Sequence, residues 1–320
     1  MPKRKPPVVF RPADAHPNPA VSPPEPGVPG TTTEDVWQNL RGLTAARIAL
    51  GRAGTSQPTA PHLEFQLAHG RARDAVHARL DTVALAEQLR GRGHETLLLA
   101  SAAPDRATYL QRPDLGRTLS QSALELLERR RKDRGDPAKP NAKSGAASGA
   151  KPRFDVAFVI ADGLSALAIE RNALSLIDAV WPLLEGSRWR LAPIAVVSQG
   201  RVAIGDEIAW RLGAGLVVVL IGERPGLSAP DSLGVYLTHA PKPGRRDAER
   251  NCISNIREGG QSHAAAAATL VYLIGEARRR KLSGVQLKDD TAKPTLGTTA
   301  QQNSLDARRD KLTADKDRQP

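Results

Sequence analysis

The sequence predicts an α/β protein whose parallel sheet follows a small, mostly helical region. Three compact apolar runs at 156–160, 192–197 and 216–221 are rich in valine and bounded by turn residues, which is typical of buried strands. Segments with the length and composition of helices separate them, at 164–184 and 205–212. Because strands and helices alternate, we expect a Rossmann-like parallel sheet.

The region before this sheet has a different pattern. Residues 62–80 and 119–127 space their apolar side chains as a helix does, and residues 83–89 resemble another helix. A short extended segment is expected at 95–100. These elements predict a small helical domain that precedes the sheet.

Composition divides the chain into five segments. The proline density at the N-terminus forbids regular helices, and a run of lysine, glycine, serine and proline before the sheet is typical of a linker. A strand at 233–238 and a helix at 262–281 are expected to complete the sheet. The predicted segments are a disordered proline-rich arm (1–43), a helical domain (44–131), a flexible basic linker (132–153), a Rossmann-like domain (154–284) and a disordered polar tail (285–320).

The composition favours a cytoplasmic protein that associates with neither membranes nor specific nucleic acid. Cys252 is the single cysteine, so an intramolecular disulfide is excluded and a reducing compartment is expected. The longest apolar runs are shorter than the about 18 residues of a membrane span. Most of the net charge of +12 falls in residues 129–153 and 276–320, and an aromatic content of 3% leaves little for base stacking.

Three predicted strands are followed directly by loops that contain glycine, at 161–165 (ADGLS), 198–202 (SQGRV) and 221–227 (IGERPGL). Ligands of open parallel sheets bind beyond the carboxyl ends of the strands, and glycine allows the backbone to approach a ligand closely. Turn formation alone would also explain any one of these glycines. The loops match no dinucleotide or P-loop pattern, and no histidines or cysteines have metal-ligand spacing.

A serine hydrolase is one alternative interpretation. The turn around Ser165 resembles half of a nucleophile elbow, and Glu223 and His239 follow in the acid-then-histidine order of that class. However, Leu167 replaces the second elbow glycine. Ser165 is explained more simply as a helix cap, and we expect the same role for Asp162.

Several strings of the sequence together resemble the small subunit of ethanolamine ammonia-lyase. Their order and spacing agree with that family, and the resemblance covers about residues 44–128 and 154–284. The matching strings are TAARIALGRAG (44–54), YLQRPDLGR (109–117), VIADGLS (159–165), GERPGL (222–227) and RNCISNIREGG (250–260).

The resemblance implies an adenosylcobalamin-dependent enzyme that converts ethanolamine to acetaldehyde and ammonia by radical chemistry. In this family a large subunit holds the substrate and the catalytic residues, and the small subunit closes over the cobalamin. The resemblance therefore implies no catalytic residue in this chain. It also implies a hetero-oligomer, expected to be a dodecamer of six large and six small chains.

Three positions match cobalamin-contacting residues of the family: Val202 after SQGR, Glu223 within GERPGL and Cys252 within NCISNI. We expect Val202 to offer an apolar surface, Glu223 to accept hydrogen bonds from amides at the corrin edge, and Cys252 to make a compact contact. The sequence has no D-x-H-x-x-G loop, and the surroundings of His239 differ from that pattern. Cobalt is therefore expected to keep its own benzimidazole ligand, as the resemblance also implies.

The chain departs from the family's pattern in three segments: the N-terminal arm, the basic linker and the polar tail. Some relatives carry an amphipathic N-terminal segment linked to packaging in a bacterial microcompartment, which the proline-rich arm 1–43 cannot form. Packaging is therefore doubtful. The linker and the tail are longer than the family needs, and a basic adaptor that meets acidic partners through them is a further alternative.

Overall fold

The computed structural model describes residues 32–33, 35–44, 46–133, 152–186 and 189–288. The predicted arm, linker and tail lie largely outside the described residues. The chain divides into two compact units, Met1–Leu63 and Glu64–Pro320. The described part of the first unit holds an antiparallel pair, β1 (Thr32–Thr33) with β2 (Arg52–Ala53), and the 3-10 helix η1 (Gln38–Leu43).

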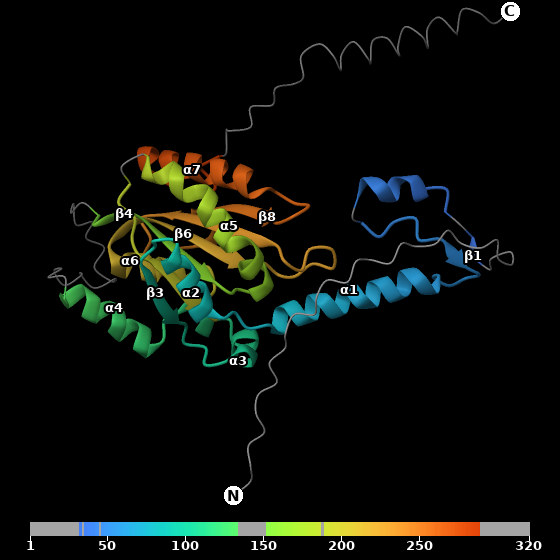
Figure 1. The fold of residues 1–320 in the computed structure, drawn as a ribbon, viewed down its shortest axis with the longest axis horizontal. Coiled ribbons are helices and arrows are strands. Elements are labelled where there is room, and N and C mark those ends of the chain that lie inside the picture. The colour runs from blue at the N-terminus through green and yellow to red at the C-terminus, as the bar shows by residue number, and fades with distance from the viewer. Residues whose placement is uncertain (1–31, 34, 45, 134–151, 187–188, 289–320) are drawn as a thin grey trace, which may run out of the picture. The chain divides into compact units, whose positions relative to one another are not determined.

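The second unit is built on a six-stranded sheet with the order β3-β5-β4-β6-β7-β8 (Figure 1). The first four strands in this order run parallel, and β7 is antiparallel to both of its neighbours. The strands are β3 (Thr96–Ala100), β4 (Phe154–Ala161), β5 (Ile194–Ser198), β6 (Ala214–Gly222), β7 (Leu233–His239) and β8 (Arg250–Ile256).

Helices cover both faces of this sheet. One face packs against α2 (Thr82–Gly91), α5 (Ala166–Glu185) and α7 (His263–Arg280), and Figure 1 shows α5 beside α7. The other face packs against α4 (Gln121–Asp133) and α6 (Ile204–Leu212). Central strands covered on both sides need apolar side chains at nearly every position, which explains their valine-rich runs.

Two helices that precede β4 in the chain contribute to the site described below. Helix α1 (Thr59–His77) and the short α3 (Arg106–Gln111) flank α2 and β3 along the chain. The Asp105 side chain caps α3 by accepting a hydrogen bond from Thr108 N at 2.8 Å. Within the described residues, no helix is both long and apolar enough to cross a bilayer.

The predicted α/β fold class is confirmed, as are the parallel strands and the helices between them. The structure differs in the place of residues 95–100, because β3 pairs in parallel with β5 and so belongs to the main sheet. The helices of 44–131 therefore surround a strand of that sheet. Strand pairing across about a hundred residues leaves no local sequence signal.

Strand β8 was not predicted. Ile253 and Ile256 are buried against α7, whereas Cys252 is exposed, and the pairing register with β7 shifts between these two isoleucines. An edge strand that is half exposed carries too few apolar residues to be recognised as a run. The structure thus places Cys252 on a strand.

Candidate functional site

Asp162 lies directly after β4 and is almost completely buried, with 1% of its surface exposed. Its carboxylate accepts a hydrogen bond from Gly200 N at 3.0 Å and pairs with Arg106 Nη1 at 3.4 Å. Burial raises the pKa of this carboxyl, while the Arg106 charge and nearby backbone amides act in the opposite direction. The predicted cap at Ser165 is confirmed, because its side chain accepts a hydrogen bond from Ala168 N at the start of α5. The capping role predicted for Asp162 is wrong, since its carboxylate contacts Arg106 and Gly200 N.

Arg106 fills the space between the carboxyl ends of β4 and β5. Its Nη1 donates to Gly163 O at 2.8 Å and Gln199 Oε1 at 3.3 Å, and its Nε donates to Val76 O at 2.8 Å. The chain leaves β4 toward α5 on one face and β5 toward α6 on the other, which makes this the topological switch point of the sheet. Ligands of many open sheets bind at such a point, but here a buried arginine occupies it.

Tyr109 holds the neighbouring loops together. The ring is fully buried, its hydroxyl donates to Gly200 O at 3.0 Å, and the guanidinium carbons of Arg106 and Arg201 lie 4.9 and 4.4 Å from the ring centre. Gly116 is needed beside it, because a Cβ at that position would come within 2.8 Å of the ring. The YLQRPDLGR string therefore docks on the loop that carries Val202.

Two open cavities lie beside this packed cluster, at the same edge of the sheet. The larger, of ≈ 450 Å³, and the smaller, of ≈ 350 Å³, share Arg201, Val202 and Tyr236 in their walls. Glu223 lines the larger cavity only. Val202 and Glu223, which follow different strands, are thus brought to one surface.

Glu223 is held at one carboxylate oxygen. Its Oε2 accepts hydrogen bonds from Ser232 Oγ at 2.5 Å and Asn255 N at 3.3 Å. Gly234 leaves room for the side chain, since a Cβ there would lie 2.9 Å from Oε1. Among the described residues no donor bonds to Oε1, so this oxygen can accept a hydrogen bond from a ligand.

Tyr236 connects Cys252 to the other two predicted residues. Tyr236 and Cys252 lie directly opposite each other in the β7–β8 ladder, and their side chains share a hydrogen bond. Partial burial raises the pKa of the Cys252 thiol, the hydrogen bond from Tyr236 lowers it, and the Glu223 charge raises it. Burial also raises the pKa of the Tyr236 hydroxyl, so both groups stay protonated in the neutral range.

The three predicted site residues thus have unequal positions. Val202 and Glu223 line the cavity, whereas Cys252 reaches it through Tyr236 and itself lines a hollow of ≈ 270 Å³ beside β8. Tyr236 was missed because it reads as an ordinary aromatic residue of a strand. Tyr109 begins the YLQRPDLGR string that resembles the family, and Arg106 lies three residues before it. That resemblance was the only sequence feature that pointed to this part of the site.

The hydrolase arrangement is not assembled. Ser165 is fully buried, and its hydroxyl donates to Pro230 O at 2.8 Å besides capping α5. His239 lies opposite Leu216 at the amino end of β6, across the length of the sheet from Ser165. Among the described residues no group of three or more histidine, cysteine and acidic side chains could hold a metal ion.

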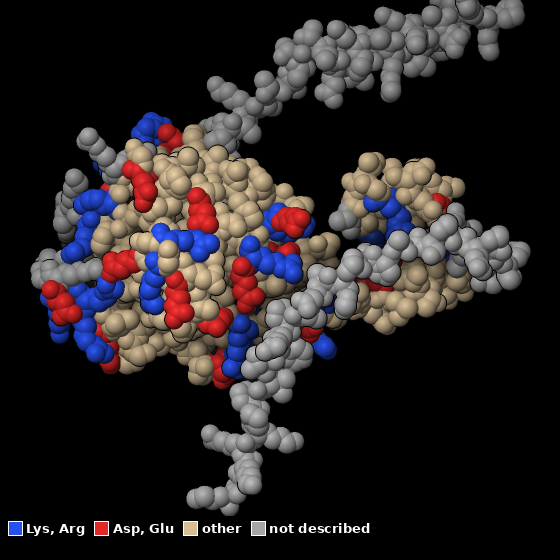
Figure 2. All heavy atoms as spheres, viewed as in Figure 1, with Lys and Arg blue, Asp and Glu red and all other residues tan. Residues whose placement is uncertain are grey.

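Charges on the visible face of the described residues are mixed. Figure 2 shows basic and acidic side chains interspersed, without a continuous field of one sign. Two segments, 129–153 and 276–320, carry most of the net positive charge, and their described residues, 129–133, 152–153 and 276–288, carry +8 of the +11 that these segments hold.

Fold and site together define an α/β protein with an open cavity at the carboxyl edge of its sheet, in which Ser165, Glu223 and His239 do not form a triad. The chain belongs to the family described as ethanolamine ammonia-lyase light chain, whose profile matches residues 34–288.

Curated relatives agree with this family over most of their length. A protein named ethanolamine ammonia-lyase small subunit in Xanthomonas campestris pv. campestris is 56% identical over 270 residues, which are 84% of this chain and 93% of the relative. Proteins of the same name in Ralstonia nicotianae and Azotobacter vinelandii are 54% and 55% identical, and cover 84% and 81% of this chain and 93% and 90% of the relatives. As a small subunit, the chain is expected to have a large-subunit partner.

Proposed function

We propose that this chain forms one wall of the adenosylcobalamin site of an ethanolamine ammonia-lyase, and that the large subunit holds the substrate and the catalytic residues. The observation that carries the proposal is the open Glu223 Oε1 beside Val202 and Tyr236, at the mouth of a cavity. Segments that follow β5 and β6 converge there with the β7–β8 face. A carboxylate with one fixed and one open oxygen is a preorganised acceptor for amide donors.

The donor set fits one side of a corrin. Amide side chains surround the corrin ring, and Glu223 Oε1 can accept from one of them, while Val202 and the exposed Cys252 offer compact apolar surface. Cavities of ≈ 450 and ≈ 350 Å³ that open to the outside are too small to enclose such a group. This agrees with a shared site whose other side a partner covers.

The reaction assigned by this proposal is the conversion of ethanolamine to acetaldehyde and ammonia. The bound cofactor would supply the radical that starts it. The residues of this chain orient the cofactor and exclude water. A protonated Cys252 and Tyr236 add no charge to that surface.

The assembly and location follow from the same proposal. We infer a hetero-oligomer of six large and six small chains that works in the cytoplasm, consistent with a single cysteine in the whole sequence. Packaging in a microcompartment stays doubtful, because the proline-rich arm lacks the expected amphipathic pattern.

The test is co-expression with a cognate large subunit, followed by measurement of cobalamin affinity and ethanolamine-dependent ammonia release. Removing the Glu223 acceptor with Glu223→Ala is expected to weaken cobalamin binding about tenfold, the value of one charge-assisted hydrogen bond. Cys252→Leu should weaken it through a steric clash. Glu87→Ala, at an exposed position on α2, is the matched control and should bind cobalamin as the wild type does.

Two results would count against the proposal in different ways. Unchanged cobalamin affinity in both site variants would reject the assigned residues. Failure of the chain to bind any large subunit would reject its role in this assembly.

A further inference from the structure

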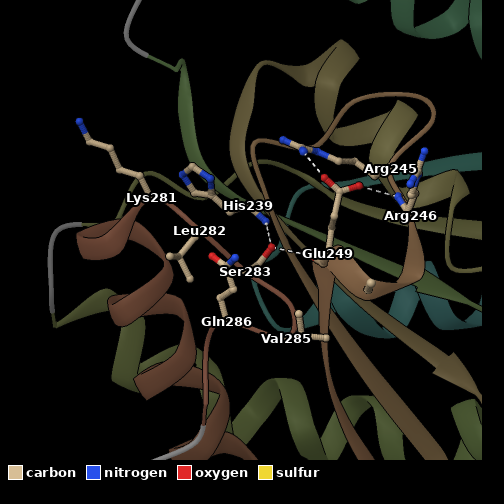
Figure 3. A pocket seen from close by; sticks show the side chains of 10 residues that line it. His239, Arg245, Arg246, Glu249, Lys281, Leu282, Ser283, Val285 and Gln286 are labelled. Atoms are coloured by element: carbon tan, nitrogen blue, oxygen red, sulfur yellow. Dashed lines mark hydrogen bonds and ion pairs between the residues drawn. The ribbon is translucent and has the colours of Figure 1, made fainter.

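A further cavity, of ≈ 550 Å³, lies at the edge of the sheet opposite the loops of Val202 and Glu223 (Figure 3). Its walls come from the end of β7, the loop at 240–249 and the segment that follows α7. The side chains that matter for its chemistry are His239, Arg245, Arg246, Glu249, Lys281 and Ser283.

This cavity has an excess of positive charge. Three cations, Arg245, Arg246 and Lys281, line the cavity together with a single carboxylate, Glu249. That carboxylate is already engaged, because it pairs with Arg245 and accepts a hydrogen bond from Arg246 N at 2.7 Å. Within the described residues, no hydrogen bond or ion pair uses the side chain of Arg246 or Lys281. Their donors are free to meet an anion.

The walls are fixed by internal hydrogen bonds. Arg245 Nη2 donates to Ala240 O at 2.8 Å, which holds the guanidinium in place. Ser283 Oγ accepts from His239 N at 2.8 Å and donates to Glu249 O at 2.5 Å, so it ties β7 to the start of β8. Figure 3 shows the two hydrogen bonds of Ser283, to His239 and to Glu249. The backbone of the cavity wall and the Arg245 guanidinium are thus fixed before a ligand binds, and only the side chains of Arg246 and Lys281 would have to be ordered by it.

His239 adds a donor that responds to charge. Burial lowers the pKa of its imidazole, and the nearby charges of Arg245 and Lys281 lower it further. Arg246 and Glu249 line the same cavity. A bound anion would offset the cations and favour the protonated ring, so anion binding and protonation of His239 should reinforce each other.

We propose that this cavity binds a doubly charged phosphate group, either inorganic phosphate or the phosphate of a small monoester. The three cations and one carboxylate of the cavity wall leave a net charge of +2, which a phosphate dianion neutralises. Guanidinium and ammonium donors suit its oxygens, since Arg pairs with them in a planar fork and Lys as a point charge. An acidic segment of another protein is a different occupant, which the experiment below distinguishes.

The test uses the purified assembly of this chain with its large subunit and measures binding by calorimetry. Inorganic phosphate, glycerol 3-phosphate and sulfate are titrated separately, and saturable binding is expected. Arg246→Gln and Lys281→Gln should each weaken phosphate binding by roughly tenfold, as loss of a charge-assisted hydrogen bond predicts. Lys242→Gln is the matched control, because Lys242 is an exposed cation of the same loop outside the cavity wall, and it should change affinity by less than about twofold.

Sulfate isolates the contribution of His239, because it keeps its charge throughout the neutral range whereas phosphate titrates there. Sulfate affinity should rise as the pH falls, and His239→Gln should remove this dependence. Tighter binding of the monoester than of phosphate would identify a phosphorylated metabolite as the source, and equal binding would identify phosphate itself.

Three outcomes would overturn the proposal. One is the absence of saturable binding by the wild type. Another is an equal loss in Lys242→Gln, which would show diffuse surface attraction. The third is binding of an acidic peptide when phosphate does not bind, which would assign the cavity to a protein partner.

Discussion

Asp162 and Arg106 form an ion pair in which both side chains are almost fully buried, with 2% and 4% of their surfaces exposed. Removing one partner leaves the other charged and unpaired in the interior, which costs about 3–5 kcal/mol. Asp162→Ala should therefore lower the free energy of unfolding by about this amount, measured by urea denaturation at neutral pH. Arg112→Ala removes the exposed Arg112–Asp114 pair of the same loop region and should change stability little. Equal effects of the two substitutions would contradict this account of the cluster.

Cys252 offers a second prediction for a single residue. Burial and the Glu223 charge raise the pKa of its thiol, against a hydrogen bond from Tyr236 that lowers it. Because the thiolate is the reactive form, alkylation by iodoacetamide should reach half its maximal rate at a higher pH than in a short peptide with the sequence NCISN. Glu223→Gln removes the negative charge and should shift this midpoint downward, whereas Glu87→Gln should not. Cys252 is the single cysteine, so the label reports on this position alone. A midpoint that ignores Glu223→Gln would show that the two groups are not coupled.

At the scale of elements, the loops that follow β4 and β6 pack closely and are joined by a hydrogen bond. Leu164 N donates to Gly222 O at 2.9 Å, and a Cβ at Gly222 would come within 2.0 Å of Ser165 O. Gly222→Ala should therefore force these loops apart, lower stability by about 1–3 kcal/mol and weaken cobalamin binding in the assembled enzyme. Gly226→Ala, in the same GERPGL string, meets its nearest atoms at 3.9 Å and should be tolerated. Thermal unfolding of the two variants compares them directly, and similar losses would contradict the close approach.

The same elements show how far the sequence could predict the fold and the site. Local sequence predicts buried strands such as β6, through an unbroken apolar run, and helices such as α5, through a serine cap. The parallel pairing of β3 with β5 depends on contacts between distant segments, so no local pattern contains it. The strand-end pattern indicated the loops of Val202 and Glu223, and the family resemblance selected these two residues within them. Tyr236 becomes a site residue only when β8 places Cys252 opposite it.

At the scale of the whole molecule, the chain belongs to a family of small subunits, and its cavities beside β6 and β7 stay open on one side. We therefore expect no ammonia release from ethanolamine by this chain alone, even with added cobalamin. Mixing with a cognate large subunit should restore release in proportion to complex formation. Ammonia release by the isolated chain would place catalytic residues within it, which the proposed division of roles does not allow.

The most direct test of the central claim is a cryo-electron microscopy structure of the assembled enzyme with adenosylcobalamin bound. We predict that the corrin lies within contact distance, about 4 Å, of Val202, Glu223 and Cys252, with an amide of its edge on Glu223 Oε1. A corrin seated elsewhere, or a large-subunit segment packed over these three residues in its place, would contradict the proposal.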